Sequence, residues 1–297
     1  MLLLVFTAPG LAQPINIKIQ SAISNSVESR AIDYLIKLIV ERSNGRVQIQ
    51  RLPDSDDVTE HKAILEQQIQ MGLLNSASLR QELPLLELFE LPFLYTDRQQ
   101  LHNILDSDIG RQILQSVSRQ GLKPLCFWDE SFLQLAADRG LMSPQQVSGL
   151  SFSNRQSPLD KIFTGVERDT GSAEEVFEVS LGKLAAGQFE PPVTDLTLSN
   201  HAATGALLLV NQDFWGKLPD DLKVIISGAV KDTTTYAREL ISEADRLALQ
   251  KLEKSGRYRL HRLTPEQWSA WQKGVMQIYR QQFNSKELQF IEIILRS

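Results

Sequence analysis

The chain has 297 residues, enough for two lobes that each bury a hydrophobic core without support from a metal or a disulfide. Hydrophobic residues make up 42% and charged residues 23% of the sequence, which is ordinary for a globular protein and excludes a disordered or membrane-embedded class. The formal net charge of −5 argues against nucleic acid as a partner, because attraction to phosphate needs a basic excess.

Residues 1–12 form a short apolar stretch that ends in small residues. Such a stretch is typical of a signal peptide, so we expect export to the periplasm and cleavage before Gln13. No Lys or Arg follows Met1, which leaves a start upstream, a partial signal or a buried N-terminal strand as alternatives. No later run is long and apolar enough to span a bilayer. The single cysteine, Cys126, excludes an internal disulfide, and its apolar neighbours predict a buried thiol.

Strands and helices alternate in the first part of the chain. Ile15–Gln20 and Val47–Gln50 alternate apolar with polar residues and predict strands, and Glu28–Arg42 between them has the spacing of an amphipathic helix. A parallel crossover is the economical topology for this order. Thr59–Met71 predicts a second helix, closed by a glycine. The Leu- and Pro-rich segment Leu83–Tyr95 predicts short packed pieces, because closely spaced prolines prevent one long helix.

The pattern continues with a helical region over Arg98–Arg119 and a strand over Leu122–Trp128. Leu150–Arg155 predicts another strand, and Ala173–Ala186 has helical spacing. The continuous apolar run Leu207–Val210 predicts a strand that is covered on both faces.

Two helices are predicted near the C-terminus. One begins at Pro219, has acidic residues in its first turn and reaches about Ser255, so it is long enough to lie across two lobes. Thr264 repeats the start signal and opens a final helix that ends near Phe283. No internal repeat or flexible linker is evident.

Several strings in the chain occur in the order, and near the spacing, of strings in one known family. They are Asn44–Val47, Leu65–Gly72, Glu90–Tyr95 (similar to "DLPFLF"), Gly149–Pro158 (similar to "GLKIRVPxSP"), Gly187–Pro191 (similar to "GQENP") and Asn200–Leu222 (similar to "GHxxxPLVFLVSKKFWDSLPEDL"). No single string is diagnostic, but their joint order covers nearly the whole chain after the apolar N-terminus. The chain therefore resembles the solute-binding proteins of TRAP (tripartite ATP-independent periplasmic) transporters.

The resemblance implies an α/β, two-lobed, periplasmic-binding-protein-like fold, with hinge-crossing strands and a long helix that spans both lobes. We expect lobe I to contain residues 13–127 and about 206–250, and lobe II to contain 128–205 and about 251–297. The implied function is capture of a small polar, organic-acid-like solute by lobe closure and its delivery to the membrane permease subunits of the transporter. No cofactor is implied.

The resemblance also implies a cationic binding site between the lobes. In the family, an arginine on a strand makes a forked contact with the carboxylate of the ligand, and Ser153 stands at that position here. Arg155 lies two residues further on and points to the same face of a strand, so we predict that it substitutes. The alternative is an ordinary arginine at the rim, paired with a surface acid. A second family arginine falls on Leu133, so that cationic contact is lost.

Gln188 belongs to the string similar to "GQENP", in which Glu190 replaces the asparagine of the family. Like charges repel strongly in a closed cleft, so Glu190 disfavours a simple carboxylate bound in the usual way. Glu190 either meets an ammonium group of the solute or bonds to Arg155 and seals the site. Trp128 stacks on the solute or lines the hinge in this interpretation, although residue statistics favour packing in the core.

Two segments are shorter than in the family pattern. After Gly72 the sequence leaves no room for the usual apolar strand, although Asn75 still offers a polar group to the cleft. Residues 192–200 stand where the family has a helix. Because both losses fall near the expected site, the alternative function is that of an exported ligand sensor or a degenerate, non-transporting paralogue.

An enzyme would need convergent acid, base or nucleophilic groups. The four histidines are scattered without the spacing of metal ligands, and the sequence has no Gly-rich phosphate loop or Ser-centred nucleophile elbow. Asp129, Glu130 and Glu190 are acids that could converge, but solvated or salt-paired acids are far more common. We therefore expect neither catalysis nor a bound metal.

Overall fold

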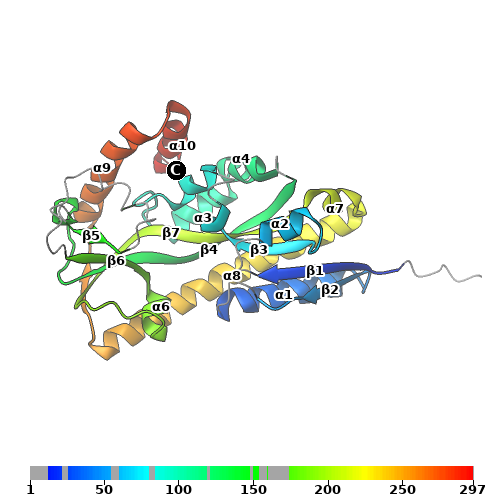
Figure 1. Cartoon of the computed structure of the whole chain (residues 1–297), viewed down its shortest axis with the longest axis horizontal. Helices are drawn as coiled ribbons and strands as arrows, with labels where there is room; N and C mark the ends of the chain where they lie inside the picture. The colour runs from blue at the N-terminus through cyan, green and yellow to red at the C-terminus, as the bar shows by residue number, and fades with distance from the viewer. Residues whose placement is uncertain are drawn as a thin grey trace, which may run out of the picture.

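A computed structural model gives the architecture of most of the chain. It describes residues 13–21, 26–54, 60–79, 84–118, 121–147, 150–153, 159 and 174–296. The molecule is elongated, with a mixed sheet along its long axis and helices on both sides of the sheet (Figure 1). The α/β class predicted from the sequence is therefore observed.

Eight strands of the described residues form the sheet. They are β1 (Ile15–Ser21), β2 (Val47–Arg51), β3 (Met71–Asn75), β4 (Leu122–Ala137), β5 (Ser151–Phe152), β6 (Glu175–Ser180), β7 (Asp195–Asn211) and β8 (Arg259–Arg262). Their order is β2-β1-β3-β7-β4-β6-β5, and β8 pairs with β7. β1 is parallel to β2, as the predicted strand–helix–strand crossover requires, and it is also parallel to β3.

Helices cover both faces of the sheet. The α-helices are α1 (Ser26–Arg42), α2 (Glu60–Leu65), α3 (Arg98–Asp106), α4 (Asp108–Val117), α6 (Leu181–Ala186), α7 (Gln212–Lys217), α8 (Asp220–Ser255), α9 (Pro265–Gln282) and α10 (Ser285–Arg296). The 3₁₀ helices are η1 (Ser76–Leu79), η2 (Pro84–Glu90) and η4 (Pro144–Val147). None of the described helices combines the length and the apolar character of a membrane span.

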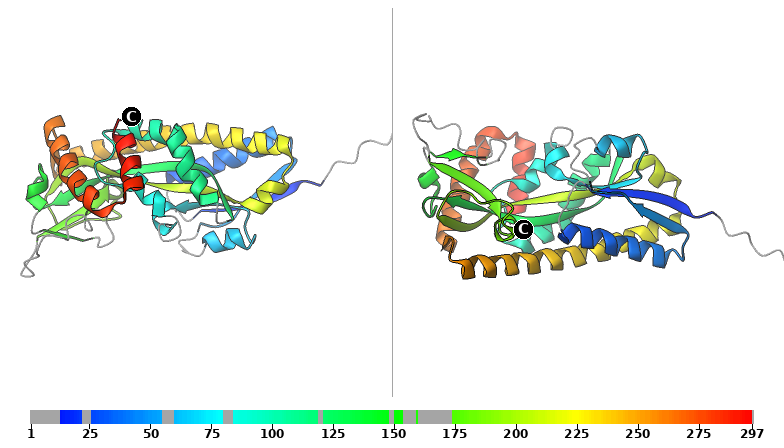
Figure 2. Two further views of the ribbon diagram at one scale, coloured as in Figure 1. Left: turned by 90° about the horizontal axis from the view of Figure 1, so that it is seen from above. Right: turned by 60° about the horizontal axis from the view of Figure 1, so that its bottom comes forward.

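The predicted long helix is α8, which has 36 residues and runs along the molecule beside α1 and then α6 (Figure 2). Asp220 and Asp221 lie in its first turn, where negative charge is favoured by the helix dipole. Gly256 ends the helix with φ of 61°, a left-handed conformation that glycine adopts without strain.

β4 and β7 are the longest strands, with 16 and 17 residues, and pair antiparallel along the length of the sheet. Their register shifts near Cys126, between Asp129 and Phe132, and between Leu133 and Leu135. Such irregularities bend and twist a pair of strands. Cys126 itself is buried, as predicted, and burial raises the pKa of its thiol to about 12.

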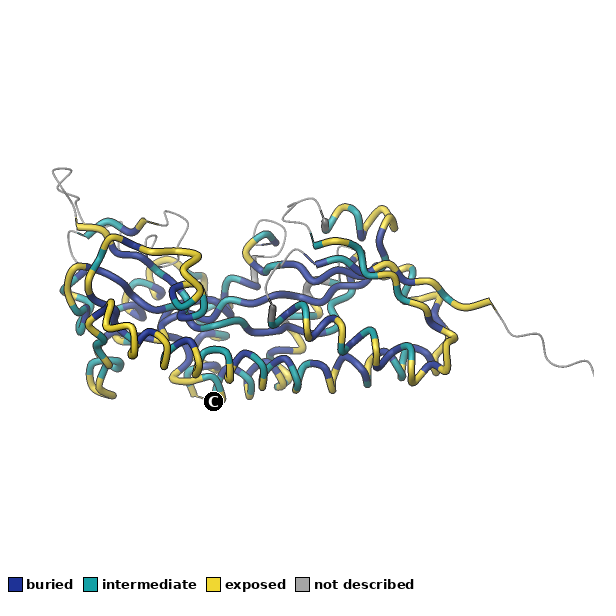
Figure 3. Tube along the Cα trace, turned by 90° about the horizontal axis from the view of Figure 1, so that it is seen from below, coloured by how far each residue is buried: buried dark blue, intermediate teal, exposed yellow. Residues whose placement is uncertain are grey.

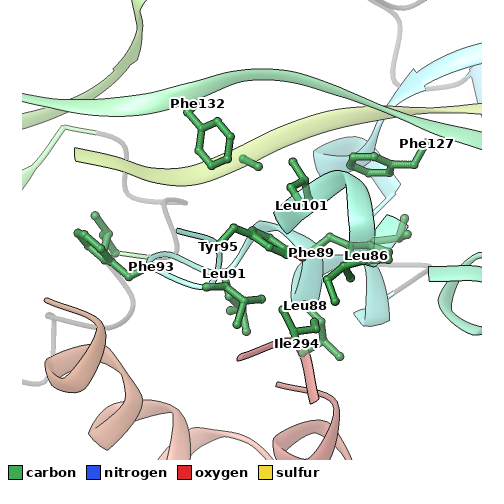
Figure 4. Close-up of a cluster of buried hydrophobic side chains, with 14 of the residues drawn as sticks. Leu86, Leu88, Phe89, Leu91, Phe93, Tyr95, Leu101, Phe127, Phe132 and Ile294 are labelled. Atoms are coloured by element: carbon green, nitrogen blue, oxygen red, sulfur yellow. The ribbon is translucent and has the colours of Figure 1, made fainter. Parts of the chain in front are cut away.

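Three hydrophobic cores follow from this arrangement. One packs β1, β3 and β7 against α1 and the first half of α8. A smaller core packs β4, β6 and β7 against α6 and the second half of α8. The third and largest lies among β4, η2, α3, α9 and α10 (Figure 4). Most residues of β4 and β7 are accordingly buried, whereas buried and exposed residues alternate along α8 (Figure 3).

The Leu- and Pro-rich segment forms short pieces, as predicted. It consists of η2 followed by irregular backbone, with Phe93 at φ of 56°. The Phe93 ring stacks on Trp271 of α9 at a centroid distance of 4.9 Å, and Tyr279 Oη donates to the carbonyl oxygen of Pro92 over 2.8 Å. Aromatic stacking and this buried hydrogen bond fix α9 against the segment.

The structure corrects the prediction that no strand follows Gly72. The predicted helix Thr59–Met71 ends as α2 at Leu65, and β3 follows at Met71–Asn75. Gln67 has φ of 59°, which an α-helix cannot accommodate, so the helix cannot continue. Met71, assigned to the end of the helix, is instead the first residue of this strand, and Leu73 and Leu74 are buried with it between β1 and β7.

Other boundaries also differ from the prediction. Within Ala173–Ala186 the described residues form β6 before the short helix α6, because Glu175–Ser180 alternates in burial as a strand does. Residues 195–200, expected as the remnant of a lost helix, extend β7. The helical region over Arg98–Arg119 divides at Ser107, whose side chain caps α4. The sequence did not predict α10, which packs on η2, and the lobe boundaries remain a prediction.

Gly205 of β7 provides a test of packing at the middle of the sheet. A Cβ atom there would lie 2.2 Å from Phe127 Cζ and 2.6 Å from the carbonyl oxygen of Trp128. We expect Gly205→Ala to reduce the free energy of unfolding by about 1–3 kcal/mol, because the strands must separate to admit the methyl group. Urea denaturation followed by circular dichroism measures the change.

Gly182→Ala in α6 is the matched control, because nothing lies within 4 Å of the added Cβ atom. It should stabilise the protein by up to about 1 kcal/mol, since alanine is the better helix former. Equal effects of the two substitutions would contradict the packing described for Gly205.

Candidate solute-binding site

Polar side chains gather where β4 and β7 cross the predicted boundary between the lobes. Trp128 and Asp129 of β4 pair with Ala206 and Gly205 of β7. Asn75, at the end of β3, also pairs with Ala206. We call residues 128–131 of β4 and 204–206 of β7 the strand crossing. It brings three strands and their polar groups to one place.

Two carboxylates lie against the strand crossing. The Ser76 hydroxyl bonds to the carboxylate of Glu90, and its Oγ lies 2.7 Å from the carbonyl oxygen of Gly205. Thr204 Oγ1 donates to Glu130 Oε2 over 2.8 Å. Burial raises the pKa of Glu130 above its ordinary value, although the hydrogen bond from Thr204 opposes this effect. Each of these carboxylates therefore accepts a hydrogen bond from a hydroxyl group.

α1 contributes a third carboxylate. Glu28 is 3% exposed and lies on the same face of the helix as the apolar stripe, four residues before Ile32. Burial and the negative charge of Glu130 raise the pKa of Glu28 to about 8, with Asp129 adding a smaller effect. At neutral pH its carboxyl group is mainly protonated and can donate a hydrogen bond. We call Glu28, Glu90 and Glu130 the central carboxylate cluster.

Asp129 has a different environment, although it is only 1% exposed. Arg98 of α3 donates to it through Nη1, and His102 Nε2 lies 2.9 Å from Asp129 Oδ1. Burial raises the pKa of Asp129, but the hydrogen bond to His102 and the charge of Arg98 outweigh it, so the pKa lies below its usual range. Asp129 is a compensated anion beside the central carboxylate cluster.

A hydrogen-bonded chain of Ser199, His201 and Glu178 lies further along β7. Ser199 Oγ is 2.8 Å from His201 Nδ1, and His201 Nε2 is 2.8 Å from Glu178 Oε1. The order is that of a hydrolytic triad. Ser199 and His201 are each 1% exposed, however, so a substrate does not reach the hydroxyl. These hydrogen bonds instead connect β6 to β7 across β4, next to the bulge at Asn200, where φ is 45°.

Comparison with known proteins identifies the relatives of this chain. The family described as "Bacterial extracellular solute-binding protein, family 7" (DctP) matches residues 20–164 and 180–286. The chain belongs to this family. It is therefore a solute-binding protein, as the sequence predicted.

Curated family 7 relatives match along most of the chain. The C4-dicarboxylate-binding periplasmic protein DctP of Rhodobacter capsulatus is 25% identical over 295 residues, covering 93% of this chain and 89% of the relative. The protein of the same name from Shewanella loihica is 24% identical over 291 residues, covering 91% and 86%.

Solved structures share the fold. A TRAP periplasmic solute-binding protein of Ochrobactrum anthropi aligns with a TM-score of 0.86 at 20% identity and covers 96% of this chain and 95% of its own. One from Sulfurospirillum deleyianum, with bound succinate, aligns with a TM-score of 0.76 at 27% identity, covering 95% and 99%. The predicted TRAP resemblance and the two-lobed fold are confirmed.

Of the predicted site residues, Asn75 and Trp128 are brought together, on either side of Ala206. Asn75 is half-buried, and its Oδ1 accepts a hydrogen bond from the backbone of Ala77. Trp128 is 2% exposed, packs in the core with α1 and α8, and donates from Nε1 to Thr234 Oγ1 over 3.0 Å. Core packing, the interpretation favoured by residue statistics, is what Trp128 does.

Three of the other predicted residues lie away from the strand crossing. Ser153 is exposed after β5, at one edge of the sheet, and its backbone N–H donates to Val176. Gln188 is exposed in the turn after α6. Glu190 is exposed and pairs with Arg257 over 2.7 Å. Arg155 lies outside the described residues, so its proposed contact with the solute remains a prediction.

Sequence reasoning missed the central carboxylate cluster as a group. One signal was available for Glu28, which occupies the apolar stripe of a predicted helix where a hydrophobic residue is usual. Glu90 and Glu130 carry no such signal, because their approach depends on pairing of strands far apart in sequence. Within the described residues, no three His, Cys, Asp or Glu side chains converge as metal ligands do.

The raised pKa of Glu28 predicts an unusual dependence of stability on pH. Between its ordinary value of 4.5 and about 8, the folded protein retains a proton that the unfolded chain releases. Stability is therefore lost as pH rises through this window, at about 1.4 kcal/mol per pH unit. Glu28→Gln should remove this loss, so the variant melts above the wild type at pH 8 and nearer to it at pH 5.

Thermal melts across this pH range, read by circular dichroism, measure the difference. The control is Glu41→Gln, which alters a solvent-exposed carboxylate of the same helix and should keep the wild-type profile. Parallel profiles for Glu28→Gln and the wild type would show that the Glu28 carboxyl group titrates as it does in the unfolded chain.

Proposed function

We propose that the chain is the extracytoplasmic solute-binding subunit of a TRAP transporter. It captures a small polar, organic-acid-like solute in the periplasm by lobe closure and delivers it to membrane permease subunits. The observation that carries the proposal is the match along 95% of the chain to a TRAP protein that holds succinate. Closure follows from differential affinity, because a solute between the lobes contacts both of them only in the shut form.

The central carboxylate cluster limits the chemistry of the solute. Glu130 accepts a hydrogen bond from the Thr204 hydroxyl and lies near the negative charges of Glu90 and Asp129, so an anionic group brought close to it is repelled in a medium of low dielectric. An acid that also carries hydroxyl or amino groups offers donors to Glu130 while its own carboxylate contacts a cation elsewhere. We therefore favour hydroxy acids and amino acids over simple dicarboxylates as solutes.

Arg155 is the cation we propose for the carboxylate of the solute. A thermal-shift screen of organic acids, amino acids and amines first finds the compounds that raise the melting temperature. A solute at a hundred times its Kd stabilises the folded protein by about 2.7 kcal/mol. We expect Arg155→Ala to abolish most of the shift produced by acids, because the bidentate contact is lost.

Arg262→Ala is the matched control, since this exposed arginine pairs with Glu253 on the surface. Its thermal shifts should equal those of the wild type. Full shifts in Arg155→Ala would remove this residue from the site. A wild type that responds to no compound would favour the alternative of a non-transporting paralogue.

A further inference from the structure

Arg98 joins three elements at the strand crossing. It extends from the first turn of α3, donates to Asp129 of β4 through Nη1, and donates to Asp245 Oδ2 of α8 through Nη2 over 2.6 Å. Ser131 Oγ, also on β4, donates to Asp245 Oδ1 over 2.6 Å. We call Arg98, Asp129, Ser131 and Asp245 the hinge network. One guanidinium thus connects α3, in the predicted lobe I, to β4 and α8, two of the elements that cross the predicted boundary.

The hinge network lies where β4 changes register. The shift falls between Asp129 and Phe132. Arg98 contacts both sides of it, because Nη1 also donates to the carbonyl oxygen of Glu130 over 3.2 Å and the guanidinium lies 5.5 Å from the centre of the Phe132 ring. A strand bends most easily at such an irregularity, so these contacts fix the angle at which β4 continues.

Asp245 lies at a point of change on α8, as Asp129 does on β4. Before it, Ala229, Val230 and Ala237 belong to the core packed on α1. After it, Ala248 and Leu252 belong to the core packed on α6. Asp245 therefore lies between the two stretches of α8 that bind different halves of the molecule.

The environment makes these contacts strong. The side chains of Arg98 and Asp245 are 17% and 19% exposed, and that of Asp129 is 1% exposed. Charge pairs in partly buried positions are screened little by solvent, and removing one member leaves the others uncompensated. A rotation that separates α3 from β4 or α8 must therefore break directional contacts between charges.

We propose that Arg98 is a positioning residue that sets the angle between the two halves of the empty protein, and thereby its affinity for solute, without touching the solute. The effect on affinity depends on the lobe closure proposed above, whereas the effect on the empty protein does not. If only a fraction of the molecules adopt the binding-competent angle, the apparent Kd varies inversely with that fraction.

Pulsed electron spin resonance measures the angle directly. Spin labels are attached to Lys37→Cys on α1 and Ala186→Cys on α6, which are both exposed, while the native Cys126 is buried and unreactive. We expect Arg98→Ala to shift or broaden the distance distribution of the protein without added solute. Arg98→Lys should give an intermediate change, because an ammonium group cannot fork onto Asp129 and Asp245 together.

The matched control is Arg246→Ala, which removes an arginine of α8 that pairs only with Glu243 among the described residues. It should leave the distribution unchanged. Asp245→Asn preserves the size of the side chain and leaves the contact between Arg98 and Asp129. It should shift the distance distribution in the same direction as Arg98→Ala. It replaces Arg98→Ala as the test if Arg98→Ala does not fold. Unchanged distributions in folded Arg98→Ala and Asp245→Asn would overturn the proposal.

Titration with a compound that closes the wild type, beginning with the hydroxy acid malate, provides a coupled readout. If Arg98→Ala moves the empty protein toward the solute-bound distance, the apparent Kd should fall about five- to fifty-fold; if it moves the protein away, the Kd should rise by a similar factor. A Kd that changes in the direction opposite to the one expected from the distance would overturn the positioning role of Arg98. So would a Kd that changes while the distance distribution does not. A wild type that no compound moves, with Arg98→Ala still shifted, would refute the proposed function and support the hinge role.

Discussion

The compensation of buried charge at the strand crossing is the constraint on which the rest of the structure depends. A carboxylate at the centre of a sheet is costly unless hydrogen bonds or cations replace its water. Asp129 meets this requirement through Arg98 and His102, which come from a helix on one face of the sheet. α3 must therefore stay close to β4, and through Asp245 it must also stay close to α8.

The two faces of the sheet behave differently at this point. On one face, Phe127 and Phe132 of β4 belong to the large core that also holds Phe93 and Trp271. The hydrophobic contribution of such packing has no preferred direction, although the close fit of the side chains holds α9 in place. On the α8 face, the cores packed on α1 and α6 are separate, and the charges between them are directional. Under the hinge role proposed for Arg98, these directional contacts limit how the two halves turn relative to each other.

Local patterns predicted much of the fold, because the residues that specify them are neighbours. The start of α8 at Pro219 and the cap of α9 at Thr264 are examples. β3 was missed because Met71 was assigned to the end of a helix that Gly72 closes, and only the pairing of Met71–Asn75 with β1 and β7 reveals a strand there. The contact of Arg98 with Asp245 spans 147 residues, and no local pattern encodes it.

The chemistry of the solute depends more on which carboxylates of the protein have a cationic partner than on how many carboxylates there are. Arg257 pairs with Glu190, and Arg259 pairs with Asp195, so these arginines are occupied at the surface and at the edge strand β8. Because Glu190 has its own cation, it adds little repulsion to a carboxylate in the cleft, which weakens the reason for expecting it to exclude acids. Glu130, whose carboxylate accepts a hydrogen bond from the Thr204 hydroxyl, is the stronger source of repulsion in the proposed site. We therefore expect discrimination among acids to depend on the donors that a solute presents to Glu130.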